Sequence, residues 1–77
     1  MNKSSYNKAL KKFGERLSEL RKKKNLSLRD LSYSCDIDNS KISKIEKGMI
    51  NISLTTAIQL AKALEVPLSD LMEFDTD

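Results

Sequence analysis

Two short apolar repeats, separated by only three residues, constrain the fold of this chain more than any other feature of its sequence. Apolar side chains recur three or four positions apart within residues 28–35 and again within residues 39–47. Such spacing places them along one face of a helix. The pattern predicts two short helices joined by a tight turn, and their apolar positions are Leu28, Leu31, Cys35, Ile42 and Ile45.

Polar residues mark the ends of both predicted helices. Ser27 offers an N-cap, and Asp30 lies three residues later, which gives a weak form of the capping box. Asp36 suits a left-handed turn conformation, although it is less permissive than glycine. Asp38 can cap the second helix, and Gly48 is a good C-terminal stop for it.

The rest of the chain predicts three more helices. One should run from about Asn7 to Lys24, with Asn25 in a left-handed conformation after it. Another follows a cap at Ser53, and Pro67 ends it while fitting the first turn of a last helix. Aromatic residues make up 5% of the chain, with one proline and two glycines, which argues against a β-sandwich or a low-complexity segment. The predicted fold class is all-α.

The residue inventory argues against an enzyme or a metal site. The chain has one cysteine and no histidine, so it cannot assemble a standard zinc ligand set, a Ser-His-Asp triad or a Cys-His pair. We therefore expect no catalytic residues, no metal and no cofactor. Cys35 could be a redox-sensing thiol, but its spacing from Leu28 and Leu31 favours a small buried apolar residue.

Charge is distributed unevenly along the chain. Residues 1–24 carry nine lysines and arginines against two glutamates, whereas residues 51–77 carry one lysine against five acidic residues. A basic front of this kind orients a molecule toward a polyanion, although it can also be an ordinary solvated surface. No apolar run approaches the roughly 18 residues that span a bilayer, and the N-terminus is not a secretory signal. We expect a cytoplasmic protein without a membrane or small-molecule partner.

The helix predicted at 39–47 has two distinct faces. At about 100° per residue, Ile42 and Ile45 fall together on one side. The polar positions that could reach the edges of DNA bases are Asn39, Ser40, Lys41, Ser43 and Lys44. These positions could instead be solvent-facing without a function. The short helix before it, at the spacing that braces one helix against a DNA groove, favours the DNA-reading interpretation.

The run from Phe13 to Leu71 resembles the phage repressor and Cro-like helix-turn-helix family, often called the Xre family. The resemblance rests on the segments FGERLSELRKKKNLSLRDLS, ISKIEKG and SLTTAIQLAKALEVPLSDL. It implies a compact five-helix, lambda-repressor-like DNA-binding domain that binds double-stranded operator DNA, commonly as a homodimer on pseudo-palindromic sites. We expect an N-terminal extension at 1–8, the helix-turn-helix domain at 9–74 and an acidic tail at 75–77.

The resemblance also assigns roles to individual residues. The family's base-reading positions fall on Asn39, Ser40, Lys41 and Lys44. Its phosphate-contacting positions fall near Arg21, Ser27, Leu28, Arg29, Lys47 and Asn51. A structural ion pair of the family maps onto Arg21 and Glu46. The last helix offers a candidate dimer interface at Leu68, Leu71, Met72 and Phe74.

The chain departs from the family pattern at three positions. Leu28 stands where many members have a glutamine that touches phosphate and braces the second of the two helices. Asp36 replaces a common glycine in the turn. Asp36 and Asp38 would also repel phosphate unless they cap backbone N–H groups or accept a hydrogen bond from cytosine.

The leading hypothesis is a sequence-specific transcriptional regulator. The segment NISL, at 51–54, is similar to controller proteins of restriction-modification systems, while a phage-type repressor or a DNA-binding antitoxin remains an alternative of the same class. A different class is a protein-interaction module whose main partner is another polypeptide. Lys44 and Lys47 on the exposed side favour DNA over that alternative.

Overall fold

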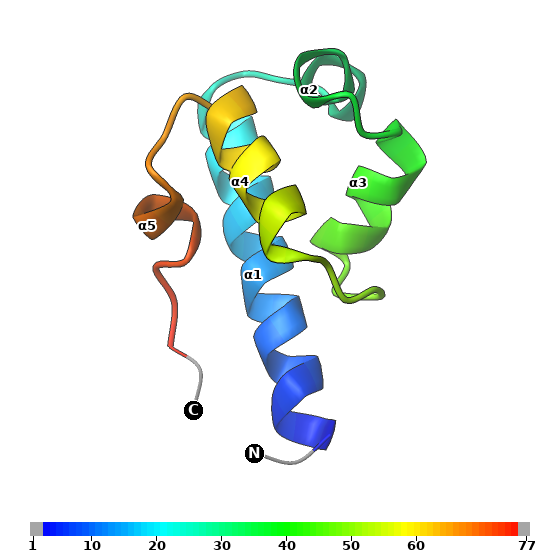
Figure 1. Cartoon of the computed structure of the whole chain (residues 1–77), viewed down its shortest axis with the longest axis vertical. Coiled ribbons are helices and arrows are strands. Elements are labelled where there is room, and N and C mark those ends of the chain that lie inside the picture. Colours follow the sequence, from blue (N-terminus) through cyan, green and yellow to red (C-terminus); the bar gives the residue numbers. More distant parts are fainter. Residues whose placement is uncertain (1–2, 76–77) are drawn as a thin grey trace.

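A computed structural model describes residues 3–75 of the chain, and all regular secondary structure in that range is helical. The helices are α1 (Lys3–Lys23), α2 (Leu28–Cys35), α3 (Asn39–Glu46), α4 (Leu54–Ala63) and α5 (Leu68–Leu71) (Figure 1). The predicted all-α class and the order of the helices are confirmed.

The first helix begins earlier than predicted. α1 starts at Lys3 instead of Asn7, because no proline or glycine interrupts the sequence between them. Residues 3–8 therefore continue the helix that carries the core residues. The division into segments 1–8, 9–74 and 75–77 stays a prediction, and residues 76 and 77 lie outside the described range.

The core draws side chains from all five helices. α1 packs against α3 and α5, α2 packs against α3 and α4, and α4 packs against α5. Burying one large aliphatic side chain stabilises a fold by about 1.5–3 kcal/mol, so a core shared by every helix holds the short ones in place. The buried apolar residues are Phe13, Leu17, Leu20, Leu31, Cys35, Ile37, Ile42, Ile45, Ala57, Leu60, Ala61, Leu64 and Leu71.

The helix ends follow the signals in the sequence. Asn25 and Asp36 adopt left-handed conformations, with φ of 58° and 60°. Ser53 caps α4 by accepting a hydrogen bond from the N–H of Thr56 at 3.1 Å. Pro67 stands one position earlier than predicted, as the N-cap of α5, since its ψ of 150° is extended and not helical.

The segment after α5 lies along α1. The rings of Phe13 and Phe74 meet edge to face, with centroids 6.4 Å apart. Arg16 Nε donates to the carbonyl oxygen of Asp70 at 2.7 Å, and Lys12 Nζ donates to that of Asp75 at 2.6 Å. These contacts hold the end of the described chain against the first helix (Figure 1).

Cys35 belongs to the core. Its side chain is 7% exposed, and burial raises the pKa of the thiol. Because the thiolate is the reactive form, this environment supports the buried apolar interpretation over a redox sensor. Within residues 3–75, no helix is long and apolar enough to cross a membrane.

Candidate nucleic-acid interface

The N-terminus of α2 is held by a reciprocal capping box. Ser27 Oγ accepts from the N–H of Asp30 at 3.0 Å, and the Ser27 N–H donates to Asp30 Oδ2 at 2.9 Å. These hydrogen bonds lower the pKa of the Asp30 carboxyl. The N–H groups of Leu28 and Arg29 occupy the first turn, where a helix offers no carbonyl to receive them. They are available to an anion at this end of α2.

The turn between α2 and α3 is locked at both ends. The N–H of Asp36 donates to the carbonyl oxygen of Ser32 at 3.1 Å, which closes α2 in the left-handed conformation. Ile37, in the middle of the turn, is 8% exposed and anchors it in the core. Asp38 then caps α3, because its Oδ2 accepts from the N–H of Ser40 at 3.0 Å and also from the Ser40 hydroxyl.

Capping gives Asp38 a structural role at the start of α3, where its charge would otherwise only repel phosphate. The hydrogen bonds from Ser40 lower the pKa of the Asp38 carboxyl. Its negative charge is used to satisfy the backbone of α3 and is favourable at a helix N-terminus. The Ser40 hydroxyl donates to the cap, so its oxygen remains free to accept a hydrogen bond.

α3 buries one face and exposes the other. Ile42 and Ile45 are 0% and 2% exposed and fix the helix in the core. The opposite side carries Lys44, and Lys41 and Lys47 are also exposed. None of these three lysines takes part in the salt bridges found in residues 3–75. α3 therefore presents exposed positive charge that no salt bridge of the described residues engages.

The predicted ion pair joins α1 to the end of α3. Arg21 Nε lies 2.7 Å from Glu46 Oε2, and Nη2 lies 3.0 Å from Oε1, so the contact is bidentate. Arg21 Nη1 also donates to the carbonyl oxygen of Leu26 at 2.8 Å. The bond to Glu46 raises the pKa of the Arg21 guanidinium. Arg21 is 9% exposed, so its placement supports the structural role and not the predicted phosphate contact.

Gly14 permits the close approach of α3 to α1, and sequence reasoning missed it. A Cβ at Gly14 would lie 2.5 Å from the carbonyl oxygen of Ile45, closer than real Cβ atoms come. The position of Gly14 inside an otherwise continuous apolar repeat was a usable signal, because a glycine in a helix costs stability unless packing requires it. Gly14 and the Arg21–Glu46 pair together set how α3 lies on α1.

Comparison with known proteins fits this geometry. A sequence profile described as helix-turn-helix matches residues 17–71. The chain belongs to the helix-turn-helix family. It is 38% identical over 65 residues to control protein C.BamHI of Bacillus amyloliquefaciens, an alignment covering 83% of this chain and 80% of that protein. It is also 37% identical over 62 residues to the HTH-type transcriptional regulator DdrOP3 of Deinococcus deserti, covering 80% of this chain and 48% of that protein.

A solved structure supports the same assignment. The fold is similar to the crystal structure of the restriction-modification controller protein C.AhdI from Aeromonas hydrophila, with a TM-score of 0.79. The two sequences are 40% identical, and the match covers 80% of this chain and 94% of that one. The predicted family and fold are confirmed.

Within this helix-turn-helix fold, the predicted phosphate-contacting positions differ in exposure. Ser27, Arg29, Lys47 and Asn51 are exposed. Leu28 is half-buried and packs against the core, so only its backbone N–H is offered to a ligand.

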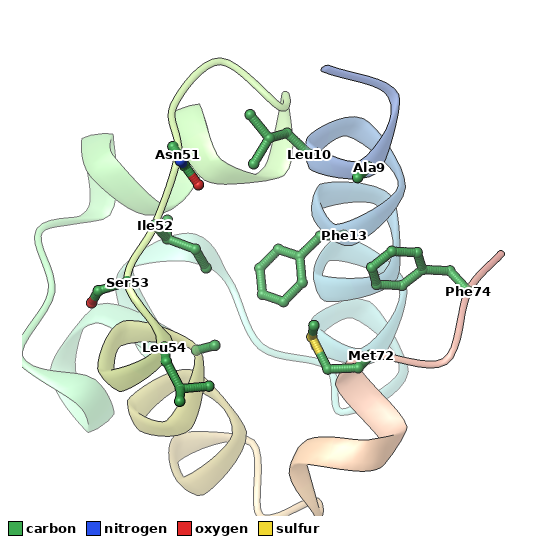
Figure 2. Close-up of a pocket in the computed structure, with 10 residues that line it drawn as sticks. Ala9, Leu10, Phe13, Asn51, Ile52, Ser53, Leu54, Met72 and Phe74 are labelled. Carbon is green, nitrogen blue, oxygen red and sulfur yellow. The ribbon is translucent and has the colours of Figure 1, made fainter. Parts of the chain in front are cut away.

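A second surface is an apolar groove of about 200 Å³ between the first half of α1, the segment before α4 and the segment after α5 (Figure 2). Leu54 and Met72 stand at its edge and are 67% and 48% exposed. Among the residues predicted for a dimer interface, Leu68 and Phe74 are half-buried. Leu71 is wrong for that role, because it is 0% exposed within its own subunit. The residues around the groove are Ala9, Leu10, Phe13, Asn51, Ile52, Ser53, Leu54, Ala57, Met72 and Phe74.

Proposed function

We propose that this protein is a sequence-specific transcriptional regulator that places α3 in the major groove of double-stranded DNA. The observation that carries the proposal is the outer side of α3, where Lys41, Lys44 and Lys47 are exposed and form no salt bridge in the described structure. The similarity to C.BamHI and C.AhdI favours a controller of a restriction-modification system within this class.

Base reading is assigned to residues 39–44 of α3. Lys44 and Lys41 can donate to the O6 and N7 atoms of guanine, and Asn39 can pair bidentately with adenine. The hydroxyl oxygen of Ser40 can accept from a base while its proton is held by Asp38. The caps on both sides of the turn fix these side chains on a preformed helix, which lowers the entropy cost of binding.

Phosphate contacts are assigned to the flanks of α3. The N–H groups of Leu28 and Arg29 lie at the N-terminus of α2, where the helix dipole favours an anion. The side chains of Arg29, Lys47 and Asn51 are exposed and able to reach the phosphates of the DNA backbone. At Leu28, the main-chain N–H alone thus makes the phosphate contact that a glutamine side chain makes in many family members.

The groove beside α1 is assigned to a second copy of the chain. Its exposed Leu54 and Met72 are large apolar side chains, and a chain of 77 residues gains stability by sharing such surface. A two-fold dimer would present two α3 helices to the half-sites of a pseudo-palindrome, one helical turn or a multiple of it apart.

Selection of bound duplexes from a random pool tests the regulator proposal. We expect a two-fold symmetric sequence, and we expect Lys44→Ala to cost about 1–3 kcal/mol of binding free energy and to relax one position of the site. Lys62→Ala, an exposed lysine on α4, is the matched control and should bind as the wild type does. Enrichment of no sequence, with binding that ignores salt concentration, would instead favour a protein-interaction module.

A further inference from the structure

The first turns of α1 lie beside the connection between α3 and α4. A Cβ at Gly48 would lie 2.8 Å from the Cα of Lys11, so the two backbones are in direct contact. Asn51 lines a shallow hollow with side chains from the start of α1, namely Tyr6, Asn7, Ala9 and Leu10. Figure 2 shows Asn51 and Leu10 at the same end of the groove. The start of α1 therefore lies beside Gly48, the neighbour of Lys47, and beside Asn51. Lys47 and Asn51 are both assigned to phosphate.

Lys8 and Lys11 differ from Lys12, Arg16 and Arg21 of α1 in their partners. Arg16 and Arg21 are engaged by protein carbonyls and carboxylates. Lys8 and Lys11 are exposed, and neither takes part in a salt bridge found in the described range. Since they stand one turn apart, they form a row of positive charge on a rigid helix.

We propose that Lys8 and Lys11 bind DNA backbone phosphates next to those contacted by Lys47 and Asn51, and so lengthen the contact with DNA outside the base-reading site. The inference rests on the proposed DNA-binding function. It concerns residues outside segment 17–71, the part of the chain that matches the family profile. Because the lysines are held on a helix, binding a phosphate orders no flexible arm and costs only side-chain entropy.

A local structural role for Lys11 makes a different prediction. The end of α3 presents carbonyl oxygens and the negative end of its dipole, and Lys11 lies against Gly48 just beyond it. If Lys11 served only to offset that dipole, its removal would lower the free energy of unfolding and leave the salt dependence of DNA binding unchanged.

The experiment measures DNA affinity against salt for the full chain and for Lys11→Gln and Lys8→Gln/Lys11→Gln. The probe is a duplex carrying the selected site with about one helical turn, 10 base pairs, on each side. Each lost phosphate contact should lower the salt slope by about 0.9, so between about 50 and 200 mM salt the wild type should lose about 3.5-fold more affinity than Lys11→Gln. For the double variant the difference should be about 12-fold.

Three controls separate the loss of phosphate contacts from a loss of stability and from a general effect of charge. Lys62→Gln should keep the wild-type slope, and thermal unfolding of the α1 variants should match that of the wild type. Trimming the flanking base pairs should weaken wild-type binding but not that of the double variant. Unchanged slopes with a salt-sensitive wild type would overturn this inference alone, whereas a wild type that does not bind the duplex would overturn the proposed function as well.

Discussion

Replacing Glu46 by glutamine tests whether the Arg21–Glu46 pair holds α3 on α1. The change keeps the shape of the side chain and removes the charge that faces the guanidinium at 2.7 Å and 3.0 Å. The side chains of Arg21 and Glu46 are only 11% and 10% exposed, so water can replace the lost carboxylate only in small part. The guanidinium would then be buried with hydrogen bonds to a neutral amide and to the carbonyl of Leu26.

The size of the effect follows from burial. Breaking a buried ion pair by removing one partner costs about 3–5 kcal/mol. Because both side chains keep some contact with solvent, we expect the lower end, about 3 kcal/mol. For a domain of this size that loss should lower the melting temperature by roughly 12–24 °C. Urea unfolding followed by far-ultraviolet circular dichroism measures the free energy directly.

Two further variants sharpen the measurement. Glu19→Gln is the matched control, because Glu19 pairs with Arg16 but its side chain is 58% exposed, and we expect it to cost less than about 1 kcal/mol. Replacing the pair by Arg21→Met with Glu46→Leu should cost less than Glu46→Gln alone, because no charge is left buried. If Glu46→Gln costs no more than Glu19→Gln, the pair is solvated and this reasoning is wrong.

Three other perturbations follow from the structure. Gly14→Ala should destabilise the fold by more than about 1 kcal/mol, because the added Cβ meets the carbonyl of Ile45. Urea unfolding measures the loss, and a variant as stable as the wild type would show that α3 moves away from α1 freely. Met72→Glu should shift the protein toward monomer in analytical sedimentation without unfolding it, and an unaltered association state would remove the groove as the dimer surface. The pKa of the Asp38 carboxyl lies below its usual 3.8 in the folded state. The ionised cap therefore contributes to the free energy of unfolding above that value, and the contribution is lost as pH drops through the folded pKa. Thermal unfolding between about pH 5 and pH 3 should show a larger loss in the wild type than in Asp38→Asn, and equal losses would contradict the cap.

Local signals were sufficient to predict the helix-turn-helix unit. Ser27, Asp36 and Asp38 each act within three or four residues of their own position, so their caps and turn could be predicted without tertiary information. The faces of α3 followed in the same way from its period, with Ile42 and Ile45 inside. The Arg21–Glu46 pair was predicted through family resemblance, because 25 residues separate its members.

Long-range packing explains what sequence reasoning missed. Leu71 has the spacing of an interface residue, yet it is buried because α5 packs on both α1 and α4. The close contact at Gly14 depends on the angle at which α3 crosses α1, which no local pattern contains. The segment after α5 is held in place by contacts of Phe74 with Phe13 and of Asp75 with Lys12, and each contact joins residues more than 60 positions apart.

The stability of α3 bears directly on how binding variants should be interpreted. An isolated helix of eight residues is marginal in water, so α3 exists because Asp38 caps it and its isoleucines are buried. Variants at Gly14 or Glu46 should therefore weaken DNA binding only to the extent that their loss of stability leaves part of the protein unfolded. A variant at Lys44 should weaken binding at constant stability and change which base is preferred. Measuring unfolding and binding on the same preparations separates residues that hold α3 from residues that read DNA.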